Sequence, residues 1–130
     1  MDIENFATDA VAEESGVWIN IDDGAQVRIA RHGNNTYNRL LRDLSEPYAM
    51  SIRQGNLDDD IANKIYIKAA ARAILLDWKG ILENGQAIAY SAEKAESFLF
   101  NYPDFRKLIE ALSLERENFR KSVEENSIKN

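Results

Sequence analysis

The stretch from residue 67 to residue 105 constrains the fold more than any other part of the chain, because its pattern indicates three connected elements. An apolar helix comes first and is expected to end at Trp78 and Gly80, since a glycine just past the last turn is a common helix stop. A short turn with a strand follows, and then a new helix. None of these elements carries a recognisable catalytic group.

The helix that leads into this stretch is the clearest in the sequence, and we expect it over residues 56–78. Apolar side chains recur along it at the spacing that places them on one face. Its remaining face is basic, because Lys64, Lys68 and Arg72 are four residues apart. The pattern predicts a central helix that is packed on two sides.

Turn and capping residues mark the elements that follow the central helix. Gly85, in an Asn-Gly pair, predicts a turn, and residues 86–90 are expected to form a brief strand. Ser91 is a good N-cap for the next helix. Pro103 suits the first position of a last helix, which contains Phe105. Most of the C-terminal half is therefore expected to be helical.

The N-terminal half has the pattern of a β-hairpin at about residues 17–31, where two alternating runs flank an Asp-Asp-Gly turn. A lone hairpin is marginally stable in water, so it must pack on helices or on another chain. Residues 35–45 then predict a helix capped by Asn35 or Thr36, and residues 48–54 a further helical piece. The predicted fold class is mainly α, a small helical domain with an N-terminal β-hairpin.

The length of 130 residues suits one domain with one core. Residues 1–27 hold seven acidic residues and no basic one, and the first of them are thinly apolar. We therefore expect an acidic flexible arm over residues 1–15, a single domain over residues 16–122, and a frayed polar tail over residues 123–130.

The composition argues against several classes of function. A net charge of -6 disfavours general binding to nucleic acid, which needs a basic surface against phosphate. The absence of cysteine excludes disulfides and zinc–thiolate sites. No signal-peptide pattern is present, and no run approaches the roughly 18 apolar residues of a membrane span. We expect a soluble, cytoplasmic protein that binds neither nucleic acid nor membrane.

The residues that could carry catalysis are few. His32 is the only histidine and is expected to be an exposed loop residue. The three consecutive aspartates at residues 58–60 cannot all face one ion on a helix, so helix capping explains them better than metal binding. No phosphate-binding glycine loop and no nucleophile elbow is present. The sequence predicts no enzyme activity, no cofactor and no metal.

The charge distribution indicates an interaction protein. The acidic arm of one copy could meet the basic stripe of another, with Ile3 and Phe6 adding apolar contacts, and such a head-to-tail contact builds rings or open spirals. Trp18 lies on the more polar face of the hairpin and is either a core or an interface residue. A solvated arm and a solvated stripe explain the charges equally well.

The pattern of the C-terminal half resembles the tail assembly chaperones of long-tailed bacteriophages. In that family a Trp-x-Gly step precedes a turn, a Tyr-Ser step, a helix and a Pro-Phe step. The matching positions, which we interpret as structural, are Trp78, Gly80, Gly85, Tyr90, Ser91, Ala95, Leu99, Pro103 and Phe105.

The resemblance implies a small, mostly helical protein without enzyme activity. Such chaperones self-associate, bind the long helical tape-measure protein to keep it soluble, and recruit tail-tube protein during tail assembly. They act in the cytoplasm of the infected bacterial host and are absent from the mature virion. The resemblance implies that the present chain is the short, non-frameshifted form of the family.

Two alternative functions stay open at this point. A structural tail or head–tail joining subunit is one, although such proteins tend to be richer in strand. A small DNA-binding regulator is the other, because residues 35–55 could imitate a helix-turn-helix with Arg39, Arg42 and Arg53 against phosphate.

Overall fold

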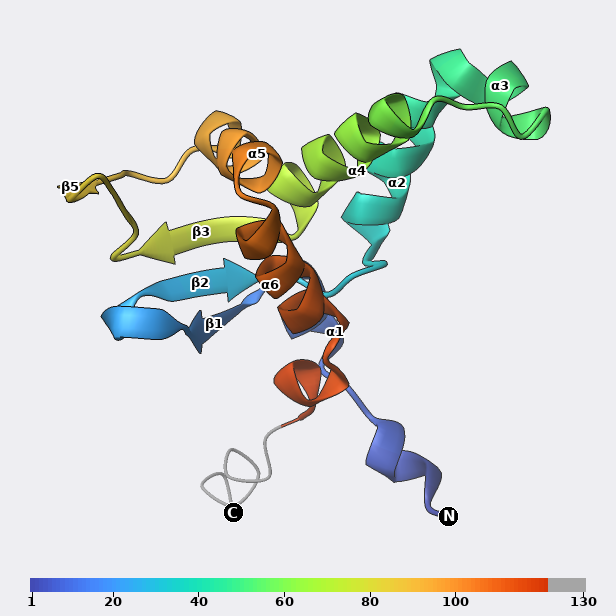
Figure 1. Ribbon diagram of the computed structural model, residues 1–130. Coiled ribbons are helices and arrows are strands. Elements are labelled where there is room, and N and C mark those ends of the chain that lie inside the picture. The colour runs from blue at the N-terminus through green and yellow to red at the C-terminus, as the bar shows by residue number, and fades with distance from the viewer. Residues whose placement is uncertain (122–130) are drawn as a thin grey trace.

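The computed structural model describes residues 1–121, and over that range helices dominate and a small antiparallel sheet packs beside them (Figure 1). The mainly α fold class is confirmed. The predicted tail over residues 123–130 lies outside the described residues. The helices are α1 (Ala10–Ser15), α2 (Asn35–Ser45), α3 (Ala49–Arg53), α4 (Asp59–Ala73), α5 (Ala92–Asn101) and α6 (Pro103–Leu114). The strands are β1 (Val17–Asn20), β2 (Gln26–Ile29), β3 (Leu75–Lys79), β4 (Leu82–Glu83) and β5 (Gln86–Ala87).

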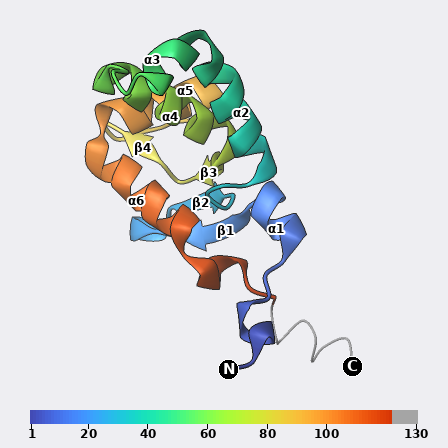
Figure 2. The same cartoon turned by 90° about the vertical axis from the view of Figure 1, so that its right-hand side faces the viewer.

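Helix α4 is the centre of the helical layer, as its pattern predicts. It packs against α2 on one side and α5 on the other, and α6 packs against α5 (Figures 1 and 2). Alanines at positions 69–71 and 73 are buried and allow this close approach. Asp58 caps the helix, since its side chain accepts a hydrogen bond from the Asp60 N–H.

The predicted hairpin is present and pairs Val17 with Ile29 and Ile19 with Val27. These apolar side chains line the face of the sheet that meets the core, where Val27 and Ile29 are fully buried. The turn is a short 3₁₀ segment, Asp22–Gly24, in place of a two-residue loop. The hairpin is not left alone, because β3 pairs antiparallel with β2 and gives the sheet order β1-β2-β3.

The expected helix over residues 56–78 is wrong at its C-terminal end. Helix α4 stops at Ala73, Ile74 leaves the helical region, and Leu75–Lys79 form β3. Pairing with β2 explains the switch, because it buries Leu75 and Trp78 on the same sheet face as Val27. Tertiary burial therefore overrides a local pattern that also fits a helix.

Gly80 consequently has a role other than the expected helix stop. It follows a strand, has a φ of +75°, and a Cβ at this position would lie 3.3 Å from the Cα of Ala25. A side chain here would be strained by the backbone conformation and crowded by the hairpin. The glycine is needed for the close approach of β3 to the hairpin turn.

The turn and caps of the C-terminal half follow their residue types. Asn84 and Gly85 both have positive φ and join the two-residue strands β4 and β5, so the strand expected over residues 86–90 is shorter than predicted. Ser91 accepts a hydrogen bond from the Lys94 N–H at 3.0 Å and begins α5. Pro103 is the first residue of α6.

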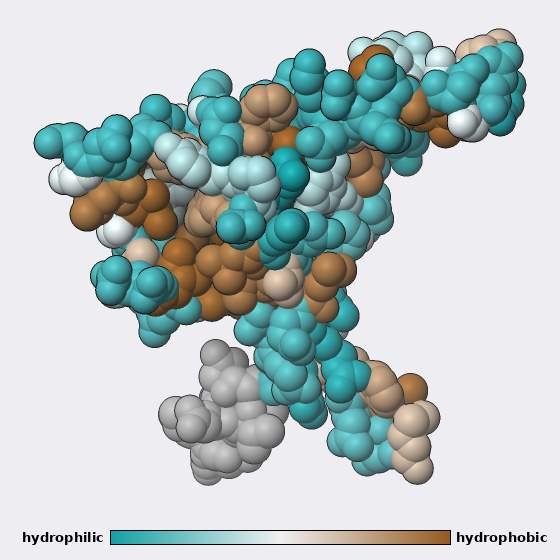
Figure 3. All heavy atoms as spheres, viewed as in Figure 1, coloured by the Kyte–Doolittle hydropathy of each residue, from teal (hydrophilic) through white to brown (hydrophobic). Residues whose placement is uncertain are grey.

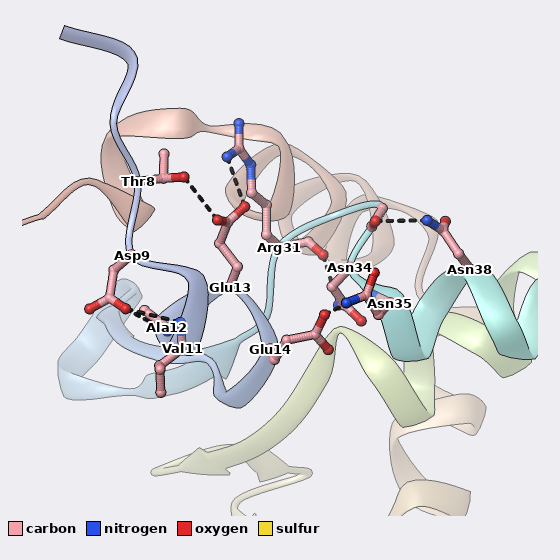
Figure 4. Close-up of polar contacts among 11 residues, drawn as sticks. Thr8, Asp9, Val11, Ala12, Glu13, Glu14, Arg31, Asn34, Asn35 and Asn38 are labelled. Atoms are coloured by element: carbon pink, nitrogen blue, oxygen red, sulfur yellow. Dashed lines mark hydrogen bonds and ion pairs between the residues drawn. The ribbon is translucent and has the colours of Figure 1, made fainter. Parts of the chain in front are cut away.

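The acidic N-terminal segment is not uniform. Residues 8–15 contact the domain: Thr8 bridges to Arg120 through the backbone, and Glu13 forms an ion pair with Arg31 at 2.9 Å (Figure 4). The Glu14 carboxylate accepts a hydrogen bond from the Asn35 N–H at 2.7 Å. The part that extends from the body is therefore residues 1–7, and the arm boundary lies near residue 8, not residue 16.

The cap of α2 is also one residue earlier than expected. Asn34, not Asn35 or Thr36, accepts the N–H of Tyr37 at 2.9 Å. Its side-chain NH₂ donates to the carbonyl oxygens of Arg31 and Ala73, each at 2.8 Å. One buried amide thus joins the start of α2 to the end of α4.

Candidate interaction surfaces

A groove lies over α4, between α5 and the end of α2 with the 3₁₀ turn Glu46–Tyr48 that follows it. We call it the α4 groove, and its volume is about 890 Å³. Its apolar lining comes from all three sides and includes Leu44, Pro47, Tyr48, Ile61, Ile65 and Phe100. Phe100 is 51% exposed, so a large aromatic surface is open at its rim.

The predicted basic stripe runs along this groove, because Lys64, Lys68 and Arg72 all line it. Arg72 is engaged within the chain by the Glu96 carboxylate of α5 at 2.6 Å. Within the described part of the chain, Lys64 and Lys68 form no ion pair. The stripe is therefore two available ammonium groups and one guanidinium that is already paired.

The predicted arm residues Ile3 and Phe6 lie far from the stripe. Both belong to a 3₁₀ turn, Ile3–Phe6, at the end of the molecule opposite α3 (Figures 1 and 2). Ile3 is 71% exposed, and Phe6 is 48% exposed with the Arg116 guanidinium 4.6 Å from its ring centre. The structure does not bring arm and stripe together within one copy.

Trp18 lies on the outer face of the three-stranded sheet. It is 40% exposed, and the Lys79 ammonium lies 4.2 Å from its ring centre. Trp78, by contrast, belongs to the core on the inner face. The two tryptophans therefore have different roles, Trp18 as a surface residue and Trp78 as a packing residue.

The other pattern positions of the C-terminal half are structural. The Trp78 ring stacks on Phe98 with centroids 5.3 Å apart and meets Tyr90 edge-on at 4.9 Å. The Trp78 indole N–H donates to the Ile88 carbonyl oxygen at 2.8 Å, and the Tyr90 hydroxyl donates to the Leu75 carbonyl oxygen at 2.7 Å. Ala95 and Leu99 are buried in the same core, and Phe105 packs against it half-buried.

A second surface is apolar and was missed from the sequence. Phe105, Leu108 and Leu112 are spaced to lie on one face of α6, and Leu108 is 40% exposed. Tyr102, just before this helix, lines a small hollow with Leu82 of β4, which is 61% exposed. We call these five residues the α6 face. In Figure 3, hydrophobic residues gather beside α6, across the strands and below the β4–β5 turn.

His32 is not the exposed loop residue that the sequence predicts. It is half-buried, and its ring centroid lies 5.0 Å from that of Tyr37. Its Nδ1 is buried and has no hydrogen-bond partner among residues 1–121. The reason is long-range, since the His32 N–H donates to the carbonyl oxygen of Ser113 in α6 at 3.0 Å. Helix α6 thus covers the loop.

Titration of the buried tyrosines gives the first prediction. Burial, and secondarily the Glu110 carboxylate, raises the pKa of Tyr66 above its ordinary value of 10.0, and the pKa of Tyr37 is raised by the same causes. Because the folded state holds these protons more tightly than the unfolded chain, their stabilising contribution is complete below pH 10 and is lost as the pH rises further. We expect the urea midpoint to fall above pH 10, and to fall less steeply in Tyr66→Phe; equal slopes would contradict this.

Three further observations bear on the kind of site present. Within residues 1–121, no group of three or more His, Asp or Glu side chains is placed to hold a metal ion. The same residues contain no helix long and apolar enough to cross a membrane. Helix α3 has five residues, a length of about 7.5 Å, which is short for a recognition helix in a DNA groove.

Comparison with known proteins places the chain in a family. A search of curated proteins and a search of solved structures gave no match. One family model matches residues 32–130, from the loop before α2 to the last residue of the sequence. The match covers more than half of the chain, so the chain belongs to the family described as YdaY prophage protein and is a phage-derived protein.

Proposed function

We propose that this protein is a tail assembly chaperone. In this proposal it self-associates in the cytoplasm of the infected host and binds the tape-measure protein. It keeps that long helical partner soluble while tail-tube subunits are recruited. It acts by binding alone, has no enzyme activity, and is absent from the mature virion.

The α6 face carries the proposal. Leu108, Tyr102 and Leu82 are exposed, Phe105 and Leu112 are half-buried on the same side of α6, and Tyr102 shares a small hollow with Leu82, so these residues offer an open apolar strip rather than an enclosed pocket. A strip of this kind suits the apolar stripe of a long amphipathic helix. A single strip binds weakly, but several copies along one helix give avidity without any tight site.

The phage origin of the family and the mainly α fold support the same function. A chaperone for a phage structural protein is consistent with a prophage family. The helical layer around α4 also differs from the strand-rich architecture expected of a tail-tube or joining subunit. Together they favour an assembly factor over a structural part.

The test is co-expression with the tape-measure protein of the same prophage. We expect the soluble fraction of that partner to rise when the chain is present. Leu108→Asp combined with Leu82→Asp should abolish the gain, because both side chains are exposed and belong to the α6 face. Leu114→Asp is the matched control, since Leu114 is 55% exposed on the same helix but off this face. Equal precipitation with and without the chain would refute the function.

A further inference from the structure

We propose that residues 1–6 of one copy bind in the α4 groove of a second copy, so that copies join head to tail. This contact is the self-association that the proposed function requires, and the proposal rests on that function only for this requirement. It leaves the α6 face free for a partner. The occupant of the groove is thus a defined segment of this same chain.

The arm carries apolar and acidic side chains, which can pair with the apolar and basic side chains of the α4 groove. Its exposed side chains are apolar at Met1, Ile3 and Phe6 and acidic at Asp2 and Glu4, and one oxygen of the Asp2 carboxylate accepts the Glu4 N–H. Residues 1–6 are exposed, and Phe6 contacts only the Arg116 guanidinium on one side, so most of this apolar surface stays open within the copy that carries it. The base of the arm is held, because Thr8 bridges to Arg120 and Asp9 caps α1.

The groove offers complementary positions on α4. Ile61 and Ile65 alternate with Lys64 and Lys68 along its lining, and Phe100 closes one side. Apolar arm residues can bury against the isoleucines and Phe100, while the arm carboxylates lie against the two ammonium groups. The spacing of four between the lysines is about 6 Å along the helix.

Three acidic residues also line the groove, the same number as its basic residues. Glu96 is neutralised by Arg72 at 2.6 Å. Asp43 on α2 and Glu93 at the start of α5 belong to the flanking helices, not to α4. Lys64 and Lys68 lie on α4 itself and do not take part in that ion pair, so an arm seated along α4 lies beside them.

The geometry makes the contact intermolecular. Figures 1 and 2 place the arm at one end of the molecule and α3, with the neighbouring ends of α2 and α4, at the other. In both views the arm points away from α4, over which the groove lies. Because the two surfaces differ and lie at opposite ends, the contact is heterologous and builds a ring or an open spiral.

Charge reversal on each side gives a test in which recovery, not only loss, is measured. The arm variant is Asp2→Lys with Glu4→Lys, and the groove variant is Lys64→Glu with Lys68→Glu. Each alone is expected to weaken self-association by on the order of tenfold or more, measured by sedimentation at low ionic strength. Mixed together, they should re-associate, because the acidic arm of one fits the basic groove of the other and the basic arm fits the acidic groove.

The controls separate this contact from general charge effects and from misfolding. Lys107→Glu with Lys121→Glu makes the same charge change on exposed residues outside the groove and should leave association unchanged. Circular dichroism checks that each variant is folded. High salt should dissociate the wild-type assembly, since the pairs are exposed.

Three outcomes would overturn the inference: a wild-type chain that is a single species at high concentration, an assembly that survives deletion of residues 2–6, or folded reversed variants that fail to recover on mixing. Its failure differs from failure of the proposed function. If the wild-type chain does not associate through its arm but still keeps the tape-measure protein soluble, only the arm contact is refuted. If the wild-type chain associates through its arm but does not keep the tape-measure protein soluble, only the chaperone function is refuted.

Discussion

Trp78→Ala is expected to lower the free energy of unfolding by about 3–5 kcal/mol, the largest effect of any single substitution proposed for this chain. Trp78 is only 4% exposed and belongs to the single core cluster between the sheet and the helical layer. Truncation removes its stack on Phe98 and its edge contact with Tyr90, and leaves a cavity that the strand β3 cannot close. The free energy of unfolding of small domains is about 5–15 kcal/mol, so this substitution would remove a large part of it.

Trp78→Ala also removes a hydrogen bond, which adds to the free-energy cost of the cavity. The Trp78 N–H donates to the Ile88 carbonyl oxygen, which ties the segment after β5 to the sheet. Trp78→Phe keeps most of the ring and removes this donor, so it should cost about 1–3 kcal/mol. The difference between the two variants reports the packing contribution alone.

Urea unfolding followed by circular dichroism measures these changes, and Trp18→Ala is the matched control. Trp18 is 40% exposed and contacts Lys79 on the open face of the sheet, so its loss should change stability by no more than about 1 kcal/mol. A Trp78→Ala protein as stable as Trp18→Ala would contradict the placement of Trp78 in the core.

Local sequence patterns were enough to predict an element when the residues that determine it lie within a few positions of it. The hairpin follows from alternation around an Asp-Asp-Gly turn, and the two-residue β4–β5 turn follows from Asn84 and Gly85. Ser91 and Pro103 begin the helices that their types predict. In each case the physical cause, a cap or a permitted backbone conformation, lies beside the element.

Strand β3 could not be predicted in the same way. The run from Ile74 to Trp78 is mostly apolar, and a short apolar run fits the end of a buried helix or a buried strand equally well. What decides is β2, which lies about 50 residues earlier in the chain and offers an unpaired edge. A long separation in sequence also explains why Asn34 was not predicted as the cap of α2, because its side chain is held by the carbonyl oxygen of Ala73, 39 residues later.

The candidate surfaces were predictable only in part. The spacing of Lys64, Lys68 and Arg72 correctly places all three along one side of α4. The pairing of Arg72 with Glu96 depends on how α5 packs, and the attachment of residues 8–15 depends on Arg31 and Arg120. The α6 face was not predicted, because the helical spacing of Phe105, Leu108 and Leu112 does not show which of these side chains the rest of the fold leaves exposed.

Asn34→Ala is expected to cost about 2–4 kcal/mol, the second large effect. The Asn34 side chain is 7% exposed and makes three hydrogen bonds, to the Tyr37 N–H and to the carbonyl oxygens of Arg31 and Ala73. Alanine removes the cap of α2 and also leaves the Ala73 carbonyl oxygen without this donor at the point where α4 ends. The two losses add because one side chain serves both helices.

Asn38→Ala is the matched control for this position. Asn38 lies one turn further along α2, is exposed, and donates from its side chain to the Gly33 carbonyl oxygen at 2.9 Å. Its removal should cost no more than about 1 kcal/mol, because water can replace an exposed hydrogen bond. Urea midpoints compare the two variants directly, and equal losses would show that Asn34 acts as an ordinary surface cap.

Asn34→Asp separates the cap from the link between the helices. Aspartate keeps the oxygen that accepts the Tyr37 N–H, so the cap of α2 survives. It loses both N–H donors and places a carboxylate against the Arg31 and Ala73 carbonyl oxygens, which repel it. We therefore expect Asn34→Asp to be at least as destabilised as Asn34→Ala at neutral pH and to recover when the carboxyl is protonated in acid. A wild-type midpoint in Asn34→Asp would show that capping alone, and not the connection to α4, makes this residue important.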